Sequence, residues 1–183
     1  MAGFRAQFRT LIGAVSLASC LLAQEAAAQE SLSMSVASDI LFPVSNFADL
    51  YNNGFGGNIQ WRFSLGSAFQ LGLTTGFFSW SVKEGRNLAD LKGVPARVLA
   101  KLNFASPMYL IAEGGAFIGW YKEESNAATK EFNFAIGFGV EPHLSKDGDI
   151  RFDTSLRYEA VARDAVPINN VVLRVGVSFT LIQ

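Results

Sequence analysis

The stretch from Val171 to Leu181 alternates between apolar and other side chains, without interruption from Leu173 onward. The apolar set is Val171, Leu173, Val175, Val177, Phe179 and Leu181, and the positions between them include Arg174, Gly176, Ser178 and Thr180. A period of two places the two sets on opposite faces of a β-sheet. A strand with so continuous an apolar face must rest against either a protein core or a lipid bilayer.

The N-terminal segment has the features of a secretory signal. Arg5 and Arg9 precede an apolar run, and a row of alanines that ends at Ala28 offers a small-residue cleavage site. These features predict a signal peptide over residues 1–28 and a mature β-barrel over residues 29–183. The apolar run is too short to span a bilayer as a helix.

A lipoprotein signal is the alternative for the same segment, with Cys20 lipidated after cleavage. Against it, Leu21 and Leu22 continue the apolar run beyond Cys20. Cleavage after Ala28 removes the single cysteine and changes the formal net charge from −1 to −2. A nearly neutral chain gives no electrostatic case for a nucleic-acid partner.

Seven further stretches repeat the alternation, so the sequence predicts eight strands. The eight predicted strands cover approximately residues 32–42, 55–64, 69–77, 97–104, 110–120, 132–141, 150–159 and 171–181. In the fifth strand we place Leu110 on the apolar face because Glu113 then falls on the polar one. The pair Phe77-Phe78 interrupts the third strand, which predicts a bulge or a change of face near Trp80.

The connections between these strands alternate in length along the chain. The long ones span residues 43–54, 82–95, 122–131 and 162–170, and the shorter ones span residues 65–67, 106–107 and 142–149. Transmembrane barrels have tight periplasmic turns at one rim and extended extracellular loops at the other. Strands of about ten residues suit a tilted crossing of a bilayer.

The polar faces of the predicted strands carry charges of both signs, which we call the lumen charge network. Its members are Arg62, Arg97, Lys101, Glu113, Glu141, Arg151, Asp153, Arg157, Glu159 and Arg174. In a soluble barrel these side chains would face water. Inside a narrow eight-stranded membrane barrel they must pair, and in pairing they would plug the lumen.

Aromatic residues gather near the ends of the predicted strands. Beside the long loops lie Phe42, Trp80, Trp120, Phe132 and Tyr158, and beside the short turns lie Phe63, Phe69, Phe104, Tyr109, Phe152 and Phe179. Two such belts are typical of the two interfaces of a bilayer. The sequence therefore predicts an all-β fold, an eight-stranded antiparallel up-and-down transmembrane β-barrel preceded by a cleaved signal peptide.

Two segments resemble the small eight-stranded outer-membrane β-barrel family of the OmpX type. Residues 42–57 resemble the passage from the first strand to the second in that family. The positions Arg174, Gly176, Phe179 and Leu181 resemble its β-signal, although the chain does not end on the aromatic residue common in the family. The resemblance implies an outer-membrane location, contact with outer-membrane lipid and lipopolysaccharide, and recognition of the final strand by the barrel-assembly machinery.

The sequence offers little for catalysis or for cofactor and metal binding. The segment His143-Leu144-Ser145 resembles the His-x-Ser motif of outer-membrane lipid A deacylases, but Lys146 follows where that motif has Asn. The segment also falls in a predicted periplasmic turn, away from the outer leaflet where those enzymes act. We therefore expect no enzyme, no cofactor and no metal site, with the deacylase as the remote alternative.

Three functions remain open from the sequence. The first is a plugged barrel with a structural, adhesion or envelope-integrity role, whose four extracellular loops could contact a ligand or host factor. The second is a narrow porin-like channel. The third is a soluble lipocalin-like barrel that holds an apolar ligand, with its charged face in water.

Overall fold

The structure is a computed structural model that describes residues 31–86, 88–121, 129–145, 149–163 and 166–182. The predicted signal peptide over residues 1–28, with Cys20, lies outside the described residues. The described residues form eight strands and one short 3-10 helix. The strands are β1 (Leu32–Pro43), β2 (Gly54–Ser64), β3 (Phe69–Trp80), β4 (Leu91–Ala105), β5 (Met108–Tyr121), β6 (Thr129–Val140), β7 (Ile150–Val161) and β8 (Ile168–Ile182), and the helix η1 (Ser45–Asp49) follows β1.

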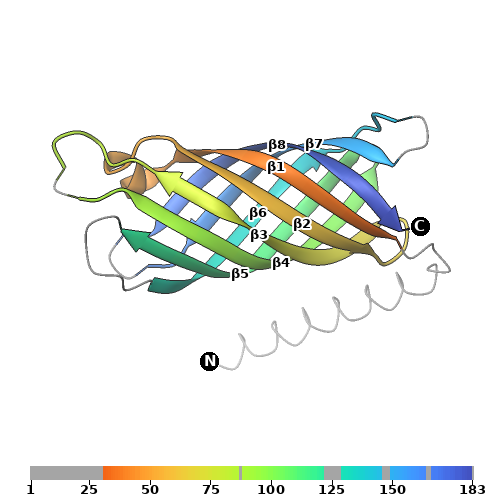
Figure 1. Ribbon diagram of the computed structural model, residues 1–183, viewed down its shortest axis with the longest axis horizontal. Helices are drawn as coiled ribbons and strands as arrows, with labels where there is room; N and C mark the ends of the chain where they lie inside the picture. Colours follow the sequence, from red (N-terminus) through yellow and green to blue (C-terminus); the bar gives the residue numbers. More distant parts are fainter. Residues whose placement is uncertain (1–30, 87, 122–128, 146–148, 164–165, 183) are drawn as a thin grey trace, which may run out of the picture.

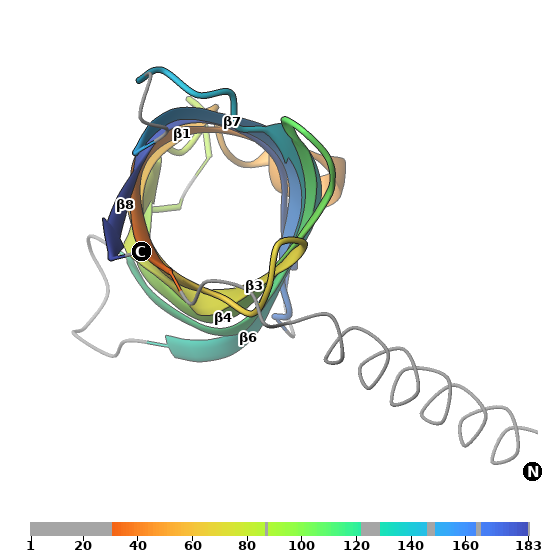
Figure 2. The ribbon, with the colours of Figure 1, turned by 90° about the vertical axis from the view of Figure 1, so that its right-hand side faces the viewer.

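The strands pair in sequence order and close into a barrel (Figures 1 and 2). Every neighbouring pair is antiparallel, and β8 pairs with β1 with Phe179 opposite Met34. The predicted fold class, an eight-stranded antiparallel up-and-down barrel, is confirmed.

Side chains sort strictly between the outside and the inside of the wall. Phe55 and Ile136 point outward and are 65 % and 60 % exposed, whereas Arg62 and Arg174 point inward and are each 1 % exposed. An apolar exterior with a polar interior suits a barrel surrounded by lipid. Exposing this continuous apolar surface to water would be unfavourable, whereas lipid chains are themselves apolar. The lipocalin-like alternative required the opposite arrangement and is wrong. Among the described residues no helix is long and apolar enough to span a membrane, which does not bear on crossing by strands.

The connections follow the predicted alternation, but three long ones are shorter than expected. β4 begins at Leu91, β6 at Thr129 and β8 at Ile168, all inside stretches predicted as loops. The hydrogen-bonded ladder extends beyond the apolar part of each strand, and hydropathy gives no signal there. The ladder even includes Pro95, which lies opposite Phe117.

The predicted bulge in the third strand is wrong. β3 keeps one register with β2 through Phe77 and Phe78, which lie opposite Gly57 and Gly56. Phe77 faces outward, and Phe78 and Trp80 face the interior. The hydropathy pattern fails here because the interior is itself apolar at this height, while the geometry of the strand continues unchanged.

Two aromatic residues assigned to the interface belts lie elsewhere. Trp80 and Tyr109 are buried inside the barrel, at 0 % and 1 % exposure. The prediction for the fifth strand is confirmed, since Glu113 is buried and Leu110 is exposed. The short connections, at residues 65–68, 106–107 and 141–149, share one rim with the start of β1 and the end of β8, and η1 lies at the opposite rim (Figure 1).

Candidate functional site: the barrel interior and its outer mouth

The interior contains two layers of different chemistry. The layer in the middle and toward the short-turn rim is charged, and the layer near the long connections is apolar. Among the described residues, five carboxylates and five cationic side chains are buried: Asp39, Glu113, Glu141, Asp153 and Glu159, with Arg62, Arg97, Lys101, Arg157 and Arg174. Nine of these ten belong to the lumen charge network predicted from the sequence, and Asp39 is the addition.

Glu113 on β5 is the centre of the first charged cluster. Its Oε1 lies 2.6 Å from Arg157 Nη1, and its Oε2 lies 3.3 Å from Arg97 Nε. Gln60 donates a further hydrogen bond to Oε1 at 2.8 Å. Arg97 also contacts Glu159, with Nη1 and Oε2 2.9 Å apart. Four strands are thereby joined across the lumen.

Glu141, directly after β6, is the centre of a second cluster at the short-turn rim. Its Oε1 lies 2.7 Å from Arg62 Nη2, and its Oε2 accepts a hydrogen bond from Lys101. Arg151 lies farther away, with Nη1 3.8 Å from Oε2, and its side chain is 28 % exposed. Arg151 is thus the one predicted network residue that the structure leaves partly open to solvent.

A third cluster spans the seam where the barrel closes. Asp39 on β1 and Arg174 on β8 are direct partners across the two strands, and Asp39 Oδ1 lies 3.0 Å from Arg174 Nε. Asn58 donates to the other oxygen of Asp39. Nearby, Asp153 accepts hydrogen bonds from Tyr109 and, at 3.3 Å, from Ser35.

The sequence analysis missed Asp39 and the neutral partners Tyr109, Gln60 and Asn58. The signal for Asp39 was present, because the alternation that begins at Ser33 continues to it without interruption. Gln60 and Asn58 alternate in step with Arg62 and so belong to the polar face, but nothing in the local pattern shows which carboxylate each one meets.

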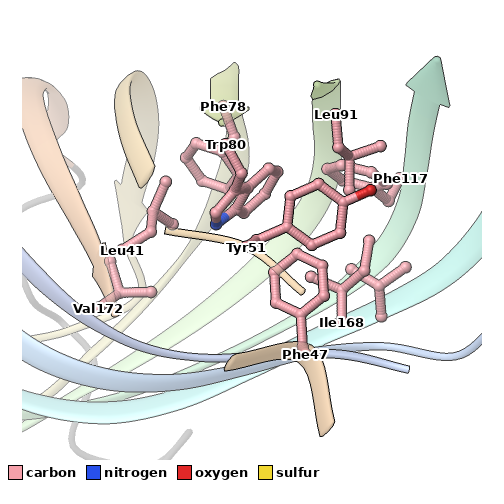
Figure 3. Close-up of a cluster of buried hydrophobic side chains, with 10 residues drawn as sticks. Leu41, Phe47, Tyr51, Phe78, Trp80, Leu91, Phe117, Ile168 and Val172 are labelled. Atoms are coloured by element: carbon pink, nitrogen blue, oxygen red, sulfur yellow. The ribbon is translucent and has the colours of Figure 1, made fainter. Parts of the chain in front are cut away.

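The apolar layer, which we call the aromatic plug, fills the mouth of the barrel near the long connections (Figure 3). Its buried members are Leu41, Phe47, Tyr51, Phe78, Trp80, Leu91, Phe117, Val161, Ile168 and Val172. Phe47 stacks on Tyr51 with ring centroids 4.6 Å apart and meets the edge of Trp80 at 5.8 Å. Trp80 also meets Phe117 at 6.2 Å.

The plug includes residues of the first long connection, which the sequence analysis placed outside as a potential ligand-binding loop. Phe47 in η1 and Tyr51 after it are 2 % and 4 % exposed. Ser45 has a φ of 57°, a left-handed conformation uncommon for a residue other than glycine, at the start of this turn. Part of the connection 43–54 therefore lies inside the barrel mouth, which the sequence did not predict, while Asn46, Asp49 and Asn52 remain exposed.

Backbone hydrogen bonds hold η1 in place across the mouth. Val44 N–H donates to Asn169 O at 2.9 Å, on the β8 side. Asn52 N–H donates to Ser81 O at 2.9 Å, and Lys83 N–H donates to Leu50 O at 2.9 Å. The first connection is thus tied both to β8 and to the second connection, and the plug is part of the folded structure.

The histidine-serine motif lies at the short-turn rim, as predicted. His143 forms an isolated bridge with Arg151, and Ser145 Oγ accepts a hydrogen bond from the backbone N–H of Ile150 at 3.1 Å. Lys146 lies outside the described residues. The described residues contain no group of three or more potential metal ligands.

Comparisons with known proteins place the fold. No protein-family model and no curated protein matches the sequence. Among solved structures, Ail of Yersinia pestis is 17 % identical, with 82 % of this chain and 97 % of Ail covered and a TM-score of 0.53. Neisserial surface protein A is 13 % identical, with 82 % and 97 % covered and a TM-score of 0.60. The outer membrane protein OprG of Pseudomonas aeruginosa is 11 % identical, with 85 % and 97 % covered and a TM-score of 0.51. At these identities the likeness is one of fold.

A closed antiparallel barrel with an apolar exterior and a paired, charged interior is a transmembrane β-barrel. More narrowly, the chain has the fold of the small eight-stranded outer-membrane barrels.

Proposed function

We propose that the protein is a non-conducting barrel that stabilises the outer membrane and presents its long connections to the exterior for adhesion. The observation that carries this proposal is the double closure of the interior. A solute that entered from outside would have to displace the rings around Trp80 and then separate the ion pairs around Glu113. These two barriers differ in chemistry, so neither polar nor apolar solutes have an open route.

Separating the buried ion pairs would be costly. Leaving one partner of a buried pair without the other typically costs about 3–5 kcal/mol. The single carboxylate of Glu113 contacts two guanidinium groups, so opening a path beside it would disturb both ion pairs at once. The interior therefore suits a structural role better than transport.

The exterior of the long-loop rim supports the adhesion part of the proposal. Lys83, Glu84 and Arg86 are exposed in the connection between β3 and β4, above the plug. Ail, which has the same fold, is described as an attachment invasion locus protein, and one of its structures contains the heparin analogue sucrose octasulfate. We propose no catalytic role for His143 and Ser145.

Conductance in planar bilayers tests the closure. The refolded full chain should give no steady open channels, and a variant with Phe47→Ala and Tyr51→Ala should also stay closed because the charged layer remains. A steady open state in the unmodified protein would contradict the proposal and favour the narrow channel.

Cell binding tests the adhesion role. Bacteria that display the barrel should bind host cells or immobilised heparin more than bacteria without it. Replacing residues 83–86 by glycine and serine should reduce that binding while the barrel stays folded. A matched replacement in the 65–68 turn, at the opposite rim, should have no effect. Equal binding by all these strains would refute the adhesion role and leave the structural role.

A further inference from the structure

Two lysines interrupt the apolar outer face of the barrel. Among the described strand residues, Lys92 on β4 and Lys130 on β6 are the charged side chains at outward positions. Their orientation follows from their strand neighbours: Phe132 and Phe134 on β6 are exposed like Lys130, whereas Asn133 between them is buried. The other charged residues in the described strands occupy inward positions. Two charges of the same sign on an otherwise neutral surface require an explanation.

The two lysines lie on one sector of the barrel and at one height. β4 and β6 are the two neighbours of β5, and both lysines are close to the strand ends that lead to the long connections. Lys92 is directly opposite Trp120 of β5, and Lys130 is directly opposite Ile118, the next outward position on the same strand. Trp120 thus lies on the strand between the two lysines.

The aromatic rings beside the lysines mark the level of the membrane interface. Trp120 lies with its ring centroid 6.1 Å from that of Phe77, and Phe132 is 60 % exposed below Lys130. Tryptophan rings prefer the headgroup level of a bilayer, and lysine stems lie along apolar surface while their ammonium groups reach the polar region. We therefore expect both ammonium groups at the level of the lipid headgroups.

The carboxylates nearest to these lysines along the chain have other partners. Glu131, next to Lys130, faces inward, and its Oε1 lies 2.8 Å from Arg163 Nε. Asp90, near Lys92, accepts a hydrogen bond from the backbone N–H of Val82 at 3.0 Å. Neither lysine forms an ion pair with another described residue, and in a surrounding lipid surface phosphate is the group complementary to their charge.

We propose that Lys92, Trp120 and Lys130 form a binding site for a phosphorylated lipid headgroup of the outer leaflet. The two ammonium groups bind phosphate oxygens from either side, and the indole ring packs against the sugar part between them. The site rests on the orientation given under the proposed function, with the long connections outside, but not on the closed lumen. The phosphate of the bound lipid supplies the negative charge that complements the two lysines.

Titration of the refolded full chain in detergent with lipid A, followed by native mass spectrometry, tests the site. Each basic residue near a lipid surface contributes about 1 kcal/mol, so Lys92→Gln and Lys130→Gln should each weaken binding about 5-fold, and both together about 30-fold. Lys92→Arg with Lys130→Arg should retain binding. Lys83→Gln with Arg86→Gln, which removes the same charge from the second connection, is the matched control and should leave binding unchanged.

Two comparison ligands separate a headgroup site from general attraction. Phosphatidylcholine should bind at least 10-fold more weakly than lipid A, and inorganic phosphate should not compete at equal concentration. Equal binding of lipid A by the unmodified chain and the double glutamine variant would overturn the proposal, as would equal binding of phosphatidylcholine. All variants should keep their heat-dependent gel shift, so lost binding is not lost folding. Conductance tests the proposed function separately, because the two lysines are outside the lumen.

Discussion

Glu113 connects more of the interior than its neighbours do, because two guanidinium groups and two neutral donors meet on one carboxylate. Glu113→Gln would leave Arg97 and Arg157 with reduced compensation in a buried site. We expect the free energy of unfolding, measured by urea titration in lipid vesicles, to fall by about 3–5 kcal/mol. Glu131→Gln removes a rim carboxylate that pairs with one arginine, and it should cost under about 1 kcal/mol. Equal losses from both changes would contradict this account of the charged layer.

A substitution of the single residue Phe47 tests the packing of the aromatic plug. Phe47→Ala removes the ring that meets Trp80 and should let water reach the indole group. In a background with Trp61→Phe and Trp120→Phe, the emission of Trp80 should shift to longer wavelength, and stability should fall by up to about 3–5 kcal/mol. Phe55→Ala, on the lipid-facing side of β2, should leave the emission of Trp80 unchanged. An unchanged spectrum with Phe47→Ala would show that the ring does not shield Trp80.

Alternation alone could place single residues on the inner or outer face, but it could not pair them. Arg62 and Glu141 are far apart in sequence, and their contact depends on the curvature of the closed barrel. Trp80 and Tyr109 were misplaced because aromatic residues are expected at interfaces, and no local pattern distinguishes an inward ring from an outward one. Asp39 could have been found, since its position continues a visible alternation.

At the scale of the element, β8 carries the predicted assembly signal as well as the closing seam. Phe179→Ala with Leu181→Ala should reduce the amount of folded barrel in cells several-fold and leave refolding from urea into vesicles largely unchanged. Phe138→Ala with Leu156→Ala removes the same two kinds of side chain from outward positions of β6 and β7, and this variant should assemble nearly normally. Heat-dependent gel shift measures both. If the Phe179/Leu181 variant and the control variant assemble equally poorly in cells, lost lipid contact explains the defect. That result would contradict an assembly signal in β8.

The existence and order of the strands followed from the sequence, but their ends did not. Strand ends beyond the apolar belt are set by hydrogen bonding between neighbours, as at Leu91 and Ile168. η1 could not be predicted for a related reason. Its Phe47 packs against Tyr51 of the same connection and against Trp80 of β3, and the residues around Ser45 give no sign of the contact with Trp80.

At the scale of the whole molecule, the barrel should behave as one stable unit in a membrane. Unboiled protein should migrate differently from boiled protein in a denaturing gel, because a closed barrel resists the detergent until heated. After carbonate extraction the protein should remain with the membrane pellet. Recovery in the supernatant without a gel shift would contradict a membrane barrel, and Glu113→Gln should lower the temperature at which the folded band disappears.

The balance of five buried carboxylates and five buried cations has a consequence for the electrical behaviour of the protein. A voltage across a membrane does work on net charge, at about 2.3 kcal/mol per elementary charge for 100 mV. Because the buried charges of the described residues sum to zero, a field across the membrane exerts no net force on these ten side chains as a set. An applied potential therefore has no net charge to move among them.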